Sequence, residues 1–294
     1  MITRCKTVLD LQALPEGCIA NIISFTTPRD ACRLSSLSRI FMSAAESDTI
    51  WFKFIPPEIH SPLSPLYCLS KSKKELYLAL CDSPALIDEG KMSLSLDKWS
   101  GKKCYMISAR SLQIIWSDTP QYWRWISFPD TRFEEVAELL GVWWLEISGK
   151  IDRRMMSPST LYKAYLVYRL TAMSYGFECQ SVEVTVGGES NKRIVFLEDA
   201  GRIKKRSVYW THFLGLHAAL VQAQSSSQPR EIELARQYPK ERADGWLEIE
   251  LGEFFCEGGE EEDGELEMTC SEINGAFAKG GLIVQGIEVR PNRI

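Results

Sequence analysis

The hydrophobic pattern of this chain changes its period near residue 104, and this change limits the fold more than any other feature. In residues 19–23 (IANII) the isoleucines recur at helical spacing. In residues 247–251 (LEIEL) apolar and acidic residues alternate, which is typical of a strand with one buried and one solvated face. The 294-residue chain therefore predicts a multidomain protein, with a small all-α module followed by an all-β domain.

The helical part covers residues 14–56. Residues 14–16 (LPE) place a proline where the first turn of a helix accepts it. Residues 27–30 (TPRD) predict a second helix start, with threonine as the cap and an acid three residues later. Leu34, Leu37, Phe41 and Ala44 follow at helical spacing and predict one apolar stripe. Prolines between residues 56 and 65 then predict a domain boundary near residues 56–70, with a short helix over 74–80 after it.

Beyond residue 104, short alternating segments predict about eight strands, punctuated by Gly and Pro. These are residues 106–116, 144–151, 161–170, 182–186, 194–197, 246–251, 266–270 and 282–289. Residues 133–140 (FEEVAELL) are the one segment here that predicts a helix. Many short strands of this kind are typical of a β-sandwich or jelly roll.

An aromatic block occupies residues 111–125 (SLQIIWSDTPQYWRW) and holds Trp116, Trp123 and Trp125. Residues 118–120 predict a turn within it. Clustered tryptophans have two ordinary explanations, which the sequence leaves open. They form a packed core, or they form a stacking platform for the flat face of a sugar or base.

Charge and cysteine usage exclude several classes of protein. A net charge of −5 argues against nonspecific nucleic-acid binding, which needs a basic face. We expect no signal peptide, because the N-terminus has no apolar core segment, and no membrane span, because no apolar run is long enough. Nine cysteines without a C-x-x-C pair predict free thiols in the cytoplasm and nucleus, and we expect no metal and no cofactor. Polar residues 222–228 and the acidic segment 257–267 predict solvated loops.

The helical part resembles an F-box. The resemblance rests on LPE at residues 14–16, on Ile19 and Ile22, on the segment 33–39 and on DTIW at 48–51. It implies docking to the adaptor subunit of an SCF-type cullin-RING ubiquitin ligase. The contacts it implies are Leu14, Pro15, Ile19, Ile22 and Ile23. The alternative is a helical cap that folds back on the second domain.

The β part is similar to the phloem protein 2 family of plant lectins, to which the tobacco agglutinin belongs. Three blocks carry the similarity, at residues 116–125, 245–255 and 286–291. It implies a β-sandwich lectin domain that binds N-acetylglucosamine-containing oligosaccharides. The carbohydrate-binding residues it implies are Trp116, Trp123, Glu265 and Glu272. Each has a structural alternative: the tryptophans in the core, Glu265 as a loop acid and Glu272 as a turn cap. Residues 187–240 differ among relatives, which leaves the rim of the site open.

Together the two resemblances imply a non-catalytic substrate-recognition subunit of the ligase. The predicted domains are an F-box module (1–56), a proline-containing connecting region (57–103) and a lectin domain (104–294). The partners are the SCF adaptor with its cullin and a glycan or glycoprotein, without nucleic acid or membrane; a homodimer of the lectin domain stays open. The alternative is an F-box adaptor whose β-sandwich binds protein. A glycosidase that uses Glu265 and Glu272, or Glu248 and Glu253, is disfavoured because sequence spacing shows no acid pair and hydrolase motifs are absent.

Overall fold

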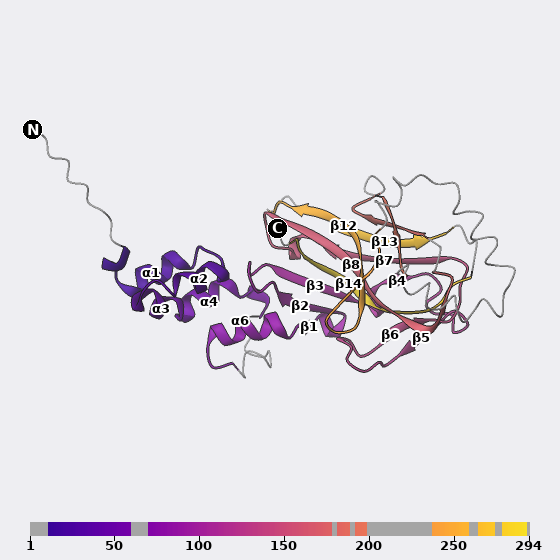
Figure 1. The fold of residues 1–294 in the computed structure, drawn as a ribbon, viewed down its shortest axis with the longest axis horizontal. Coiled ribbons are helices and arrows are strands. Elements are labelled where there is room, and N and C mark those ends of the chain that lie inside the picture. Colours follow the sequence, from indigo (N-terminus) through magenta and orange to yellow (C-terminus); the bar gives the residue numbers. More distant parts are fainter. Residues whose placement is uncertain are drawn as a thin grey trace, which may run out of the picture. The chain divides into compact units, whose positions relative to one another are not determined.

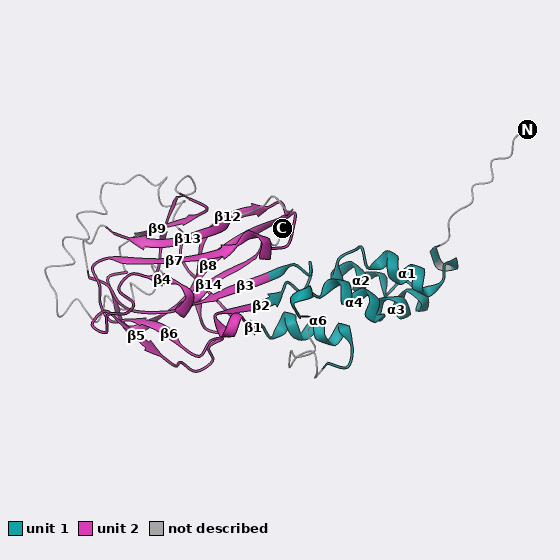
Figure 2. Cartoon of the chain, turned by 180° about the vertical axis from the view of Figure 1, so that it is seen from behind, with its two compact units in different colours: residues 1–85, 94–103 teal, residues 86–93, 104–294 magenta. Residues whose placement is uncertain are grey.

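The computed structural model describes residues 11–59, 70–177, 181–188, 192–198, 237–258, 264–273 and 278–292. It divides the chain into two compact units (Figure 2): unit 1 is Met1–Ala85 with Leu94–Lys103, and unit 2 is Leu86–Ser93 with Cys104–Ile294. The segment 57–103, expected to connect the domains, is thus shared between the units and carries a helix and two strands. The polar loop predicted at 222–228 lies outside the described residues, as does the middle of the acidic segment.

Unit 1 is helical, as predicted, and its helices begin at polar caps. The Thr27 hydroxyl accepts from the Asp30 backbone N–H at 3.1 Å, which confirms the predicted second helix start. The helix predicted over residues 74–80 is also present. The α-helices are α1 (Glu16–Ile23), α2 (Pro28–Leu34), α3 (Arg39–Ala45), α4 (Asp48–Phe54) and α6 (Lys73–Asp82), with 3-10 turns at Leu11–Ala13 and Pro57–Ile59.

The single apolar stripe predicted from Leu34 to Ala44 is wrong, because two helices share these residues. α2 ends at Leu34, and Ser38 caps α3 by accepting from the Phe41 backbone N–H. Serine side chains compete with helical hydrogen bonds in this way and favour a break. Leu37, in the connecting turn, is exposed, whereas Phe41 and Ala44 are buried.

Unit 2 contains antiparallel strands in two sheets (Figure 1). One sheet has the order β1-β2-β3-β14-β8-β12-β11, with β6 pairing β14 and β5; the other has the order β10-β9-β13-β7-β4. This confirms the predicted all-β fold, including seven of the predicted strands. The strands are β1 (Ala85–Ile87), β2 (Met92–Leu96), β3 (Lys103–Ser108), β4 (Gln113–Ile114), β5 (Trp123–Ile126), β6 (Val136–Leu139), β7 (Leu145–Asp152), β8 (Thr160–Tyr175), β9 (Ser181–Val186), β10 (Arg193–Phe196), β11 (Lys240–Glu241), β12 (Leu247–Cys256), β13 (Glu265–Glu272) and β14 (Gly280–Pro291). Three 3-10 turns lie at Asp88–Gly90, Ala109–Ser111 and Arg153–Met155.

The core of unit 2 lies between the two sheets. Alternate residues of β13, namely Leu266, Met268 and Cys270, are buried, whereas Glu265 and Glu267 on the other face are exposed. The sheets approach closely where Gly252 of β12 faces Val186 of β9, since a Cβ at Gly252 would come within 2.7 Å of a Val186 methyl carbon. The alternation seen in the sequence is therefore the alternation between core and surface.

The predicted helix over residues 133–140 is wrong. Val136–Leu139 forms β6, which pairs with β5 through Trp123↔Leu139 and with β14 through Val284↔Ala137. Glutamate, alanine and leucine favour a helix locally, but pairing on both sides outweighs a preference of a few tenths of a kcal/mol per residue, roughly. Residues 106–116, predicted as one strand, are instead β3, a 3-10 turn and β4.

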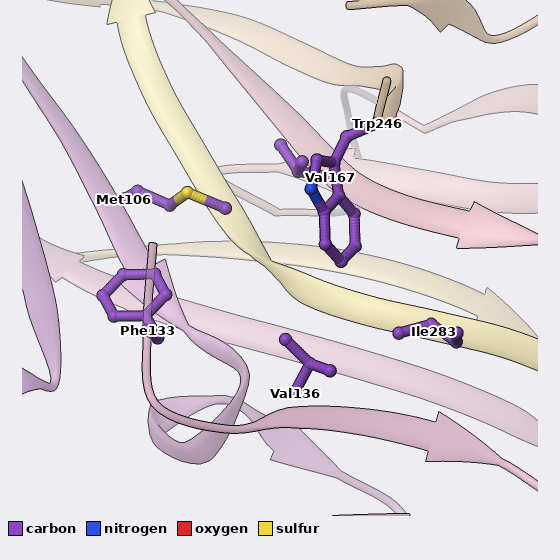
Figure 3. Packing of buried hydrophobic residues seen from close by; sticks show 6 residues of the cluster. All are labelled: Met106, Phe133, Val136, Val167, Trp246 and Ile283. Atoms are coloured by element: carbon purple, nitrogen blue, oxygen red, sulfur yellow. The ribbon is translucent and has the colours of Figure 1, made fainter. Parts of the chain in front are cut away.

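The outer face of the larger sheet is covered by a second apolar cluster (Figure 3). Trp246, just before β12, is completely buried there, and Val167 of β8 lies beside it. Phe133 and Val136 pack on this cluster from β6 and the segment before it. The members are Met106, Phe133, Val136, Val167, Trp246 and Ile283. This cluster accounts for the large apolar residues on a sheet face that would otherwise be solvated.

A group of buried charges lies on the same sheet, and we call it the ion network. Glu288 of β14 accepts from Arg132 at 3.1 Å, from Arg242 at 2.6 Å and from Arg290 at 2.9 Å. Arg290 and Arg242 also donate to Glu248 of β12, at 2.6 and 3.0 Å. Burial alone would raise the pKa of Glu288, but the attraction of the three arginines outweighs it and brings the pKa to about 2. The network ties residues 132 and 242, which lie outside the long strands, to β12 and β14.

Candidate functional site

Three exposed aromatic side chains lie together beside the smaller sheet, and we call them the aromatic surface. They are Trp116 and Tyr122, from the segment between β4 and β5, and Trp144, just before β7. They are 44%, 39% and 42% exposed, respectively. The Trp116 ring centroid lies 5.4 Å from that of Tyr122 and 6.4 Å from that of Trp144, the latter in an edge-to-face arrangement. Large rings that stay half-exposed while touching one another suit a flat apolar ligand face.

The backbone holds Trp116 in an unusual conformation. Its φ angle is +61°, in the left-handed region that bulky residues rarely adopt. Its carbonyl accepts from the Thr119 N–H at 2.9 Å, which closes the turn predicted at residues 118–120. Strained residues of this kind cluster at binding sites, where the surrounding structure fixes them.

Trp123, the second tryptophan carried over by resemblance, is buried and does not contribute its ring to the surface. Its indole N–H donates to the carbonyl of Ile115 at 3.1 Å. Because Ile115 immediately precedes Trp116, Trp123 anchors the backbone that presents Trp116. The aromatic block thus contains both a core residue and a surface residue, and each of the two explanations of the sequence applies to one of them.

Glu272, at the end of β13, is also buried, and it forms an ion pair with the completely buried Lys279. The Lys279 ammonium donates to the carbonyl of Trp143 at 2.7 Å. Val142 and Lys279 exchange two backbone hydrogen bonds, of 2.9 and 2.7 Å. Glu272 and Lys279 therefore fix the segment that leads into Trp144.

Glu265 lies far from the aromatic surface. It begins β13 opposite Asp152, whereas Glu272 ends β13 opposite Leu145. Seven residues of strand separate the two acids by about 23 Å. An odd spacing also places two side chains on opposite faces of a strand, and Glu272 indeed shares the buried face of Cys270 while Glu265 is exposed. The structure thus does not gather the four carried-over residues around one point.

Glu146 is the carboxylate that does lie at the aromatic surface, and sequence reasoning missed it. It is the second residue of β7 and half-exposed, and its carboxylate accepts from the Trp144 indole N–H at 3.2 Å. Its carbonyl accepts from the Ile115 backbone N–H at 3.1 Å, which joins β7 to the segment before Trp116. The sequence WWLEIS offered one signal, since the acid follows two adjacent tryptophans on an alternating strand.

The acids considered for glycosidase chemistry are placed differently. Glu248 belongs to the ion network, beside a cavity of about 360 Å³ that Arg242, Asp244 and Arg290 help to line. Glu253 is exposed, 4.0 Å from the Lys163 ammonium. In the described ranges no three His, Cys, Asp or Glu side chains gather closely enough to hold a metal ion. Nor is any helix among the described residues long and apolar enough to cross a membrane.

The five carried-over adaptor contacts divide into two groups. Ile19 and Ile23 are buried in the core of unit 1, whereas Ile22 and Pro15 are exposed and Leu14 is half-buried. Other large apolar side chains are exposed on the same unit. They are Leu11, Phe25, Leu37, Ile40, Met42 and Phe52.

Comparison with known proteins identifies both parts of the chain. The family model described as Phloem protein 2 matches residues 102–291. The chain belongs to the phloem protein 2 family. The F-box domain model matches residues 11–53, so this phloem protein 2 member is also an F-box protein.

Its relatives combine the same two parts in their names. In Arabidopsis thaliana, "F-box protein PP2-B10" is 43% identical over 285 residues, which cover 96% of this chain and 94% of the relative. "Putative F-box protein PP2-B8" is 46% identical over 98% of this chain and 89% of the relative. "F-box protein SKIP3" is 40% identical over 97% and 89% of the two chains. The similarity thus extends through the F-box, the connecting region and the phloem protein 2 domain together.

Proposed function

We propose that this F-box protein is the substrate-recognition subunit of an SCF-type ubiquitin ligase, and that its phloem protein 2 domain binds glycans or glycoproteins. The F-box binds the SCF adaptor and, through it, the cullin. The chain itself catalyses no reaction; it raises the effective concentration of its target near the ubiquitin-carrying enzyme. The aromatic surface beside Glu146 is the observation that carries the glycan half of this proposal.

The adaptor half is supported by the exposed apolar side chains of unit 1. A unit this small that leaves Phe25, Leu37 and Ile22 in solvent has an apolar surface suited to a protein partner. Ile19 and Ile23 serve that surface indirectly, by packing the helix that carries Ile22.

Substitution of exposed residues tests adaptor binding without disturbing the core. In pull-downs with purified adaptor, Ile22→Asp with Leu14→Asp abolishes recovery, because a charge replaces apolar contact area. Met173→Asp is the matched control, since Met173 is an exposed apolar residue of unit 2. Undiminished recovery by the double variant refutes the proposed docking surface.

The glycan half rests on the chemistry of the aromatic surface. The C–H face of a pyranose ring packs on an indole, while carboxylates and carbonyls accept from hydroxyl or N-acetyl N–H groups at the edge of the sugar. Trp116 and Trp144 provide such rings, and Glu146 provides an acceptor next to them. The family resemblance favours N-acetylglucosamine-containing oligosaccharides as the ligand.

A glycan array with the full-length chain tests this half. Wild-type binding that is lost in Trp116→Ala, but kept in Trp99→Ala, is the expected result. Trp99 is the matched control because it is an exposed tryptophan of unit 1. Absence of binding by the wild type refutes the glycan half and leaves the adaptor half intact.

A protein-binding β-sandwich is the second candidate, and one observation favours it. Ile115 and Ile273 are exposed aliphatic residues from β4 and β13 ends, near the aromatic surface along the chain. Aliphatic side chains suit a protein partner better than a sugar. Recovery of one partner protein from deglycosylated extract, lost in Trp116→Ala, would favour this candidate.

The cytoplasm and nucleus are the compartments we propose. All six cysteines within the described ranges are free thiols, namely Cys18, Cys32, Cys81, Cys104, Cys256 and Cys270. Free thiols suit a reducing compartment. Microscopy of a fluorescent fusion tests this assignment, and accumulation in the secretory pathway refutes it.

A further inference from the structure

Two carboxylates lie at the same end of the smaller sheet, and the strand register gives them different environments. β13 pairs with β7 so that Glu272 lies opposite Leu145, and Ser271 opposite Glu146. Leu145 and Glu272 are both buried, on the core side. Glu146 therefore lies on the outer side, where it is half-exposed.

The buried carboxylate is already engaged. Glu272 pairs with Lys279, and Lys279 also donates to the Trp143 carbonyl. A ligand that used Glu272 as its acceptor would have to break a buried ion pair, which is strongly unfavourable because it leaves an uncompensated buried charge.

The outer carboxylate is available to a ligand. The structure gives Glu146 one side-chain partner among the described residues, the Trp144 indole N–H, and no ion pair. One oxygen thus orients the carboxylate against the indole, and the other stays open to solvent. Trp144 itself contacts Trp116, so the acid and both rings form one continuous surface.

From this arrangement we propose that Trp144 and Glu146 contact the sugar, and that Glu146 selects neutral glycans with a hydroxyl or N-acetyl N–H donor at the edge of the ring. Glu272 is a positioning residue that acts through Lys279 and the Trp143 backbone. This inference rests on the proposed glycan binding and adds the contact residues and the ligand class.

The selectivity follows from charge. A carboxylate accepts more strongly from a donor than a neutral group does, and the bond is stronger at a partly desolvated surface. The same charge repels the carboxylate of a uronic or sialic acid sugar placed against it. Acidic glycans are therefore disfavoured at this surface.

The test compares full-length variants on an array of neutral and acidic oligosaccharides, followed by titration of the strongest neutral ligand with tryptophan fluorescence. We expect Trp144→Ala and Glu146→Gln each to weaken binding by about tenfold, the size of one lost charge-assisted hydrogen bond or aromatic contact. Glu265→Gln is the matched control and stays within about twofold, because Glu265 lies at the far end of β13.

Glu146→Gln has a second readout that a purely structural role would not change. It raises acidic glycans relative to neutral ones on the array, because the amide removes the repulsion and keeps the shape. Melting temperatures show that each variant is folded; if Trp144→Ala melts early, Trp144→Phe, which keeps a ring, replaces it and binds more weakly than the wild type but more tightly than Glu146→Gln with Trp144→Ala combined.

The outcomes separate this inference from the proposed function. Wild-type glycan binding that persists within about twofold in both Trp144→Ala and Glu146→Gln overturns the inference and leaves the glycan function standing. Loss of binding in Glu265→Gln with full binding in Glu146→Gln overturns it as well. Absence of wild-type binding refutes the proposed glycan function, and the inference falls with it.

Discussion

Removing the central carboxylate of the ion network should make the acid sensitivity of unit 2 measurable. Glu288 has a pKa of about 2 in the folded protein, against an ordinary value of 4.5. A lowered folded pKa stabilises the protein above the ordinary value, and this stabilisation is lost as the pH falls from 4.5 through about 2. At about 1.36 kcal/mol per pKa unit, the stabilisation at neutral pH is about 3 kcal/mol. Glu288→Gln should therefore lower the free energy of unfolding by about 3 kcal/mol at pH 7 and by roughly half as much at pH 3.

Urea unfolding followed by tryptophan fluorescence, between pH 3 and pH 7, measures this difference. The matched control is Glu135→Gln, because Glu135 also accepts from an arginine, Arg110 at 2.6 Å, but in an exposed pair. We expect the control to cost less than about 1 kcal/mol at every pH. A difference between wild type and Glu288→Gln that stays constant over this pH range, or that equals the control, would refute the reasoning.

Three further predictions concern the elements that position the aromatic surface and the core. Lys279→Met should destabilise the protein by about 3–5 kcal/mol, because it leaves Glu272 buried without its partner; thermal melts should show part of the loss recovered in Lys279→Met with Glu272→Gln. Gly176→Ala should lower the melting temperature more than Gly188→Ala does. Both glycines have positive φ, but a Cβ at Gly176 meets the Ala278 carbonyl oxygen whereas a Cβ at Gly188 meets open space. Native protein should expose Cys18 and Cys32 to a thiol reagent at pH 8 but not Cys270, because burial raises the pKa of the Cys270 thiol to about 12; modification of Cys270 before unfolding would contradict this.

Much of the fold could be predicted because strand alternation is a direct record of burial. The segment 266–270 alternates in sequence, and its apolar residues are those buried between the sheets. The cap at Thr27 was predictable for a similar reason, since it depends on residues within four positions of one another. Local signals fail where a partner distant in sequence decides the outcome. Residues 133–140 have helical composition, and only pairing with β5 and β14 makes them a strand.

The candidate site was predictable only in part, because exposure depends on tertiary contacts. Trp116 and Trp123 occur in one block, and the sequence alone does not tell which ring is buried. The structure decides it through the Trp123 N–H, which bonds to Ile115 and leaves Trp116 outside. Glu146 escaped notice because the acid of one strand reaches the tryptophan of another segment only through strand pairing.

The placement of Glu272 bears on how variants of this family should be interpreted. Its burial could have been derived from the sequence, since Leu266, Met268, Cys270 and Glu272 share one parity on a continuous strand. A Glu272 variant that loses sugar binding does not show that Glu272 touches sugar, because the loss of its pair with Lys279 also releases the Trp143 carbonyl and the segment that carries Trp144. The two explanations differ in stability: loss of a buried ion pair lowers the melting temperature, whereas loss of a solvent-facing acceptor such as Glu146 leaves it nearly unchanged. Binding and melting temperature measured on the same Glu272 and Glu146 variants therefore distinguish a residue that positions the surface from one that contacts the ligand.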